Sequence, residues 1–240
     1  MKLLLLSNST NTGEEYLAYS KPVIHQFLSK NQEKIIFIPF AGVTIDWNEY
    51  TGMVNKALLD VGLQVFPVHQ QKELHQAVQE ASAIMVGGGN SFQLLKLLYD
   101  HNLLELVRQK VSEGIPYVGW SAGANMACPT LKTSNDMPIV EPPSFNAFGL
   151  INFQINPHYT EEVLPNHAGE SREIRITEYI KANPESRVIG LPEGTILNVI
   201  DNQFRIIGEK GCKAFKYGKT PRWIYEDEDL NIFLNENNAR

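Results

Sequence analysis

The chain of 240 residues has little cysteine and no long apolar run, and both absences narrow what it can be. Its two cysteines, Cys128 and Cys212, form no CxxC pair, so neither a disulfide framework nor a zinc cluster is expected. Reduced thiols suit the cytoplasm, which is the location we predict. The apolar run at residues 3–6 is too short for a signal-peptide core or a membrane span, and it predicts a buried strand.

An excess of basic residues is also missing. The formal net charge is −6, so we expect neither a nucleic-acid nor a membrane partner. An acidic substrate stays possible, because a single arginine can dominate the potential of a pocket. Hydrophobic residues make up 43% of the chain and charged residues 20%, as in ordinary globular proteins, and the length favours one α/β domain over residues 1–240.

Short apolar segments alternate with helix-period segments through the first half of the chain. Strands are predicted at 2–6, 34–38, 63–68, 83–86 and 116–120, and helices at 21–30, 46–61, 73–81, 92–98 and 103–113. Asp46 and Gly62 are plausible caps of the second helix. This order predicts a mostly parallel sheet with helices on both faces.

The second half of the chain is less regular. Residues 130–148 contain several prolines and little periodicity, which predicts a long ordered loop of the kind that often serves function. Asp201-Asn202 predicts a hairpin turn. The remaining predicted elements are a strand at 153–155, a helix at 170–182, strands at 187–191, 195–200, 203–208 and 212–217, and a last strand with a frayed tail within 225–240.

The segment Gly119-Trp120-Ser121-Ala122-Gly123 matches the G-x-S-x-G pattern of a nucleophile elbow. In such an elbow a tight strand-to-helix turn makes a serine hydroxyl project from the carboxyl edge of the sheet. The three fixed letters alone are weak, and an ordinary serine at a strand end is the plain alternative. The preceding apolar strand and the following helix-forming segment favour Ser121 as the nucleophile of a serine hydrolase.

A run of glycines, Gly87-Gly88-Gly89-Asn90, ends another predicted strand. Glycine lets backbone N–H groups approach a ligand closely, so Gly88 and Gly89, together with the amide of Ala122, are candidates for an oxyanion hole. A phosphate loop is disfavoured, because no Gly-Lys-Ser/Thr ending follows. A plain tight turn is the remaining alternative. Two such strand ends favour one shared site at the carboxyl edge of the sheet.

A serine hydroxyl needs a base, and histidine is the usual one. His158 follows the strand predicted at 153–155, whereas its main competitor, His167, lies in a polar loop.

A carboxylate should hold the histidine tautomer. Asp136, in the long loop, gives the Ser, Asp, His order of α/β-hydrolases. Glu193 leaves the end of the strand at 187–191, so both carboxylates remain candidates.

Several longer segments carry a more specific signal than the elbow alone. They are LLLLSNST at 3–10, IPFAG at 38–42, VGGGN at 86–90, GWSAGAN at 119–125, NDMPIV at 135–140, INPH at 155–158 and GLPEG at 190–194. In this order, along nearly the whole chain, they resemble the peptidase E family of α-aspartyl dipeptidases.

The resemblance implies a fold and an activity. The fold is an α/β three-layer sandwich with a mostly parallel central sheet, similar to class I glutamine amidotransferases and flavodoxin-like proteins. The activity is hydrolysis of dipeptides with an N-terminal aspartate, with Ser121 as nucleophile and His158 as base. The third residue of the family's catalytic triad has been placed at the position matching Asp136 or at the one matching Glu193. No metal or cofactor is implied, the substrate is a small molecule, and we expect a monomer or a homodimer.

Selecting aspartate requires a cation. Arg172, in the segment at 169–175, occupies the position that the resemblance assigns to this task, and a guanidinium binds a carboxylate through two parallel hydrogen bonds. A solvated helix arginine is the plain alternative. Asn90, beside the glycine turn, is the second candidate contact to the substrate.

Two other functions compete with the dipeptidase. A cyanophycinase-like hydrolase would release aspartyl-arginine dipeptides from a polymer through the same serine elbow. A non-catalytic small-ligand module could share the fold. An amidotransferase is disfavoured, because the elbow carries Ser121 instead of cysteine and Thr160 stands where a glutamate would be expected two residues after His158.

Overall fold

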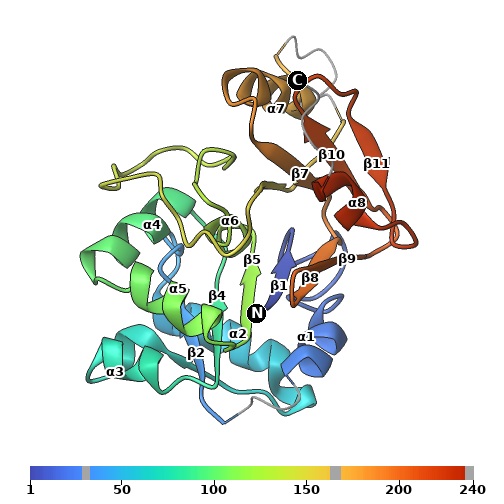
Figure 1. Cartoon of the computed structure of the whole chain (residues 1–240). Coiled ribbons are helices and arrows are strands. Elements are labelled where there is room, and N and C mark those ends of the chain that lie inside the picture. The colour runs from blue at the N-terminus through green and yellow to red at the C-terminus, as the bar shows by residue number, and fades with distance from the viewer. Residues whose placement is uncertain (29–32, 163–168, 236–240) are drawn as a thin grey trace.

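The computed structural model describes residues 1–28, 33–162 and 169–235, in which the chain forms two separate sheets (Figure 1). The larger sheet has seven strands in the order β3-β2-β4-β5-β1-β8-β9. The first five of these run parallel, while β8 and β9 are antiparallel to their neighbours. The strands are β1 (Lys2–Leu6), β2 (Ile35–Ile38), β3 (Val65–Pro67), β4 (Ala83–Val86), β5 (Tyr117–Trp120), β8 (Ile196–Ile200) and β9 (Gln203–Ile207).

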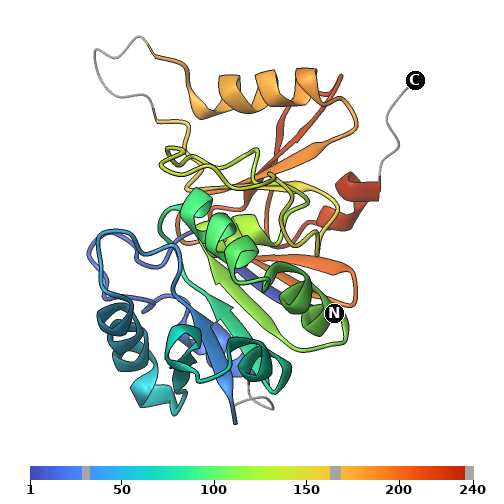
Figure 2. The same cartoon turned by 90° about the vertical axis from the view of Figure 1, so that its left-hand side faces the viewer.

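Helices cover both faces of the larger sheet (Figure 2). Alternate side chains of β1 point to opposite faces: Leu4 and Leu6 pack with α1 and α2, whereas Leu3 and Leu5 belong to the core that contains α3, α4 and α5. This is the predicted three-layer arrangement with a mostly parallel central sheet. The helices are α1 (Lys21–Leu28), α2 (Trp47–Leu58), α3 (Leu74–Gln79), α4 (Ser91–Asp100), α5 (Leu104–Ser112) and α6 (Ala122–Met126).

A second, mixed sheet of four strands was not anticipated from the sequence. Its order is β11-β10-β7-β6, with β6 (Gln154–Pro157), β7 (Arg187–Leu191), β10 (Cys212–Lys216) and β11 (Arg222–Ile224). Only β6 and β7 are parallel, and Pro157 pairs with Leu191 at their carboxyl ends. Helix α7 (Arg172–Ala182) packs on this sheet through Ile176 and Ile180, against Val188 and Phe215. Figure 1 shows the long loop at 130–148 to one side of the two sheets, above α4.

Most predicted elements are present, mostly with shorter ends, whereas α4 and β6 extend beyond the predicted 92–98 and 153–155. Helix α1 ends at Leu28, and residues 29 and 30 of the predicted helix lie outside the described ranges. The second helix is capped by Asp46, whose carboxylate accepts from Asn48 N, and its 3-10 extension ends at Gly62 with a φ of 70°. Asp201 and Asn202 have φ angles of 49° and 64°, as a type I′ hairpin requires.

The last strand predicted within 225–240 is wrong. The strand in this region, β11, ends at Ile224, and helix α8 (Leu230–Asn235) follows it. Leu230, Phe233 and Leu234 are buried at helical spacing, and the Asp229 carboxylate accepts a hydrogen bond from Asn231 N at 2.8 Å. Burial of this apolar stripe against the core therefore outweighs the polar composition of the segment.

Candidate active site

Ser121 stands between β5 and α6 in a strained conformation. Its φ of 52° and ψ of −112° are unusual for a residue with a side chain. A Cβ on Gly119 would lie 2.5 Å from Gly123 O, and a Cβ on Gly123 would lie 2.2 Å from Val86 O. The two glycines of the G-x-S-x-G pattern are therefore required, because the turn leaves no room for a side chain on either side of Ser121.

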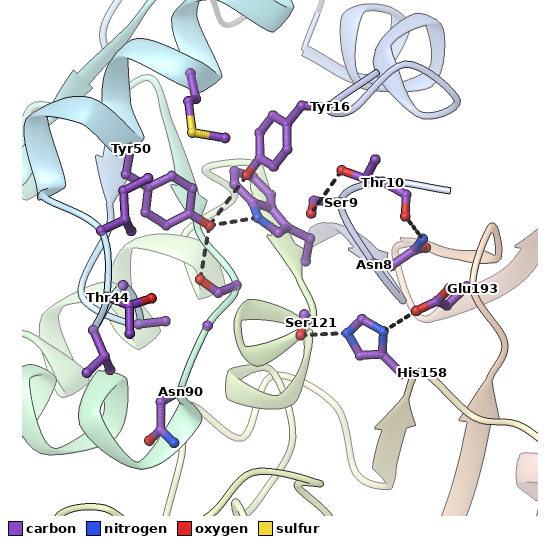
Figure 3. A pocket seen from close by; sticks show the side chains of 18 of the residues that line it. Asn8, Ser9, Thr10, Tyr16, Thr44, Tyr50, Asn90, Ser121, His158 and Glu193 are labelled. Carbon is purple, nitrogen blue, oxygen red and sulfur yellow. Dashed lines mark hydrogen bonds and ion pairs between the residues drawn. The ribbon is translucent and has the colours of Figure 1, made fainter. Parts of the chain in front are cut away.

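A chain of two hydrogen bonds joins Ser121, His158 and Glu193 (Figure 3). His158 Nε2 lies 2.9 Å from Ser121 Oγ, and His158 Nδ1 lies 2.7 Å from Glu193 Oε1. A carboxylate can only accept, so Nδ1 carries the proton and Nε2 is left to accept from the serine hydroxyl. The arrangement gives Ser121 a base within hydrogen-bond reach and gives that base an orienting carboxylate.

Strand pairing in the smaller sheet explains why His158 and Glu193 meet. His158 follows β6 directly, and Glu193 lies two residues beyond the end of β7, the parallel neighbour of β6. His158 itself has a φ of 53°, and its backbone N–H donates to Ser7 Oγ at 2.8 Å. The Ser7 hydroxyl donates in turn to Leu191 O at 2.7 Å.

Ser7 and Asn8 were missed by the sequence reasoning. Asn8 Oδ1 accepts from Gly194 N at 2.8 Å, so it holds the turn that carries Glu193. Both residues follow β1, the strand next to β5 in the larger sheet. Polar residues directly after a buried parallel strand were the signal that could have revealed them.

Asp136, the competing carboxylate, is engaged elsewhere. Its Oδ2 accepts from Ser91 N at 2.8 Å and from Ser91 Oγ at 2.6 Å, at the first residue of α4. These bonds attach the long loop to α4. Of the two carboxylates, Glu193 is the one that the structure brings to His158. His167, the competing base, lies outside the described residues.

The glycine turn lies directly against the nucleophile. A Cβ on Gly88 would lie 3.0 Å from Ser121 Cβ. The amides of Gly87 and Asn90 donate to Ile38 O and Ala41 O, whereas those of Gly88 and Gly89 have no acceptor among the described residues. The amide of Ala122 belongs to the first turn of α6, where N–H groups lack helical partners. The three amides predicted for an oxyanion hole are thus gathered near Ser121.

A cavity of about 460 Å³ opens over Ser121, His158 and Glu193. Its wall includes the glycine turn and Asn90, and no lysine or arginine lines it among the described residues. Asn90 caps α4, since its Oδ1 accepts from Phe92 N, and its Nδ2 donates to Met137 O at 2.8 Å. The Asn90 side chain therefore also holds the long loop beside the cavity.

Arg172 lines a different cavity, of about 230 Å³, which shares no lining residue with the one over Ser121. Its Nη1 donates to Asn135 Oδ1 at 2.6 Å, and Asn135 Nδ2 donates to Pro157 O, one residue before His158. Burial is the main factor that lowers the pKa of the Arg172 guanidinium; Arg175 lowers it further. The cation is therefore partly desolvated and connected to the base through Asn135.

Two other kinds of feature are absent from the described part of the chain. No group of three or more His, Cys, Asp or Glu side chains suited to a metal ion exists in residues 1–28, 33–162 and 169–235. In the same ranges, no helix is both long and apolar enough to cross a membrane.

Comparison with known proteins identifies the family. The model of peptidase family S51 matches residues 3–207. Peptidase E of Nostoc sp. is 49% identical over 233 residues, covering 97% of this chain and 96% of the relative. Peptidase E of Shewanella denitrificans is 45% identical over 231 residues, covering 96% and 98% of the two chains.

Solved structures agree with the fold. A putative peptidase E from Listeria monocytogenes superposes with a TM-score of 0.64 at 23% identity, covering 86% of this chain and 98% of that one. A peptidase from an acI-B1 actinobacterium has a TM-score of 0.67 at 17% identity, covering 95% and 96%. The family match and the close, full-length relatives lead to one conclusion: the chain is a serine peptidase that belongs to peptidase family S51.

Proposed function

We propose that the chain hydrolyses dipeptides with an N-terminal aspartate through an acyl-enzyme on Ser121. The observation that carries the proposal is the hydrogen-bonded chain from Ser121 Oγ through His158 to Glu193. The amides of Gly88 and Gly89, which have no backbone acceptor among the described residues, lie in the turn that touches the serine. Nucleophile, base, orienting carboxylate and oxyanion donors thus surround one point in a single cavity.

The reaction proceeds in two halves. His158 Nε2 accepts the Ser121 proton while Oγ attacks the scissile carbonyl carbon, and the oxyanion forms against the amides of Gly88, Gly89 and Ala122. The C–N bond then breaks as His158 donates the proton to the leaving amine. Water hydrolyses the resulting aspartyl ester with His158 again as base, which frees aspartate and Ser121.

We propose Glu193 as the third residue of the catalytic triad, since its Oε1 lies 2.7 Å from His158 Nδ1. The choice predicts that Glu193→Gln lowers kcat by orders of magnitude, because an amide no longer stabilises the imidazolium. This expectation comes from the chymotrypsin triad, where the equivalent Asp-to-Asn change lowers kcat by about 10⁴-fold. Asp136→Asn should cost far less, and a larger loss for Asp136→Asn than for Glu193→Gln would reverse the choice.

For the aspartyl side chain we propose Arg172, with Asn90 as a second contact. The support is that no lysine or arginine in the described part of the chain lines the cavity over Ser121, while Arg172 is half-buried and joined to the chain just before His158 through Asn135. A charge-assisted hydrogen bond to a carboxylate contributes about 1.5–3 kcal/mol. Arg172→Ala should therefore weaken Asp-Leu hydrolysis by about tenfold or more and leave Leu-Leu hydrolysis unchanged.

The decisive experiment measures release of leucine from Asp-Leu, Glu-Leu, Asn-Leu and N-blocked Asp-Leu by the wild-type chain and by Ser121→Ala. We expect Asp-Leu to be the best substrate and Ser121→Ala to abolish its hydrolysis. Substantial hydrolysis by Ser121→Ala would refute the nucleophile. Faster release of dipeptides from an aspartyl-arginine polymer than from Asp-Leu would point to a cyanophycinase-like activity instead.

A cytoplasmic location completes the proposal. Both cysteines are free and buried, and neither has the other as a disulfide partner. Buried reduced thiols of this kind are usual where glutathione keeps cysteines reduced.

A further inference from the structure

The Gly88–Gly89 peptide unit needs an external restraint to serve as an oxyanion donor. Neither residue has a Cβ, and Gly89 has a φ of 134°, a region that side chains rarely adopt. Glycine pairs have many accessible orientations, so the direction of the Gly89 N–H is not determined by the backbone alone. A fixed direction matters, because an oxyanion hole acts through donors that are oriented before the reaction.

Tyr50 supplies such a restraint. It projects from α2, and its hydroxyl lies 3.0 Å from Gly88 O (Figure 3). The hydroxyl also lies 3.1 Å from Trp120 Nε1 and 3.5 Å from the Tyr16 hydroxyl. An indole N–H can only donate, so Trp120 occupies an acceptor position on the Tyr50 oxygen and leaves the Tyr50 proton for the Gly88 carbonyl.

Peptide geometry converts this bond into an orientation of the amide. The described chain contains no cis peptide bond, so the Gly89 N–H points opposite to the Gly88 carbonyl. With that carbonyl held at Tyr50, the N–H faces away from Tyr50. The same network includes Trp120, the residue directly before Ser121, so one set of hydrogen bonds ties the glycine turn to the elbow strand.

We propose that Tyr50 is a positioning residue of the oxyanion hole, which holds the Gly88 carbonyl so that the Gly89 amide is presented to the substrate oxygen on Ser121. Tyr50 touches no reacting atom in this role. It is 6% exposed, and its ring packs edge-on against Phe37 with centroids 5.2 Å apart. The inference rests on the proposed function, since it needs Ser121 as the nucleophile.

The protonation state of Tyr50 is consistent with permanent donation. Burial is the main cause that raises the pKa of its hydroxyl above the ordinary value, although hydrogen bonds from Tyr16 and Trp120 oppose the shift. The hydroxyl therefore keeps its proton at neutral pH and stays able to donate to the Gly88 carbonyl.

Tyr50→Phe tests the proposal, since it removes the hydroxyl and keeps the ring. We expect kcat for Asp-Leu to fall about tenfold with KM within about twofold, because the donor is disordered but not deleted; complete removal of one oxyanion donor costs about 10²–10³. Rates are expressed per active site, titrated to completion with a phosphonofluoridate, so that misfolded protein does not count. Tyr99→Phe is the control, because Tyr99 also donates to a backbone carbonyl, Asn146 O, and neither residue lines the cavity over Ser121.

A second readout separates positioning from general disturbance of the cavity. An aspartate analogue with a boronic acid in place of the α-carboxyl forms a boron–oxygen bond with Ser121 as the hydroxyl proton passes to His158, which places one hydroxyl oxygen of the tetrahedral boronate anion at the oxyanion position. Tyr50→Phe should weaken this compound about tenfold and leave the affinity for L-aspartate unchanged, since only the tetrahedral adduct uses the amide.

Two results would overturn the role of Tyr50: unchanged kcat and boronate affinity in Tyr50→Phe, or equal weakening of the boronate and L-aspartate. Failure of the proposed function looks different. In that case Ser121→Ala of the otherwise wild-type chain still hydrolyses Asp-Leu, or the boronate does not bind to the wild-type chain at all.

Discussion

Two residues of the candidate site, Ser121 and His158, both have φ angles above 50°. Residues that carry a side chain rarely adopt this backbone conformation. Such strain persists only when the surroundings determine it. For Ser121 the surroundings are the close backbone contacts at Gly119 and Gly123. For His158 they are the hydrogen bonds of Ser7, which joins the end of β1 to the ends of both β6 and β7.

Ser7→Ala should therefore reduce both catalysis and stability. The change removes the acceptor for the part-buried His158 N, whereas Leu191 O keeps its hydrogen bond from Tyr159 N; an unpaired buried amide costs about 1–3 kcal/mol of unfolding free energy. We also expect kcat for Asp-Leu to fall about tenfold, because the imidazole loses its fixed distance to Ser121. Denaturant unfolding and steady-state kinetics measure the two effects.

Ser20→Ala is the matched control. Ser20 is also buried, and its hydroxyl donates to a backbone carbonyl, Leu17 O, at 3.1 Å. It should lower stability by a comparable amount and leave kcat unchanged. Equal kcat losses in both variants would show that Ser7 contributes only to folding.

At the scale of elements, the elbow between β5 and α6 depends on close backbone packing. Gly123→Ala would place a Cβ 2.2 Å from Val86 O, on the neighbouring strand β4. The carbonyl cannot move without breaking the sheet, so α6 and Ser121 must shift. We expect kcat to fall by about 10²-fold or more, since displacements near 1 Å have costs of this size.

Gly52→Ala, on helix α2, is expected to keep its activity, in contrast to Gly123→Ala. Gly52 lies within α2, is exposed, and has open space where a Cβ would stand. Replacing a helix-interior glycine by alanine stabilises by about 0.5–1 kcal/mol, so the thermal midpoint should rise with activity retained. Loss of activity in Gly52→Ala but not in Gly123→Ala would contradict the role assigned to the elbow.

At the scale of the whole molecule, the site lies where two sheets meet. Ser121 and the glycine turn come from the larger sheet, whereas His158 and Glu193 come from the smaller one. The hydrophobic core is shared between them, since Leu3 and Leu5 of β1 belong to the same buried cluster as Ile155 of β6 and Ile189 of β7. The distance between Ser121 and His158 therefore depends on packing of the core.

Two ionisable side chains buried in this core, Cys128 and Tyr117, predict how stability depends on pH. Burial raises the pKa of the Cys128 thiol from 9.0 to about 12, and it raises the pKa of Tyr117 well above 10.0. An unfolded thiol ionises near pH 9, while the folded one keeps its proton, so the folded state binds more protons between these values. Stability must then fall as the pH rises from about 9 toward 12.

Thermal unfolding at pH 8 and at pH 10.5 checks this expectation. The midpoint should be lower at the higher pH, and Cys128→Ala should make the decline shallower, since one buried acid is removed. Parallel pH profiles for the wild-type chain and Cys128→Ala would mean that this thiol does not contribute.

Local patterns in the sequence were sufficient to predict the parallel strands, most helices, the elbow and the hairpin at Asp201-Asn202. Each depends on residues adjacent in the chain: apolar runs buried on both faces, caps such as Asp46, and glycines at positive φ. The helix α8 shows the limit, because residues 225–240 are polar on average and only burial of Leu230 and Phe233 makes a helix favourable there.

The sequence by itself predicted Ser121 as nucleophile, the glycine turn and His158 as base, since each follows a predicted strand. Only the tertiary structure shows which of the two candidate carboxylates lies beside His158. The parallel pairing of β6 with β7 brings Glu193 to His158, while Asp136 binds Ser91 at the start of α4. Pairing between strands far apart in the chain is set by how the core packs, and packing leaves no local pattern. For the same reason, Ser7 and Tyr50 became visible as parts of the site only in three dimensions.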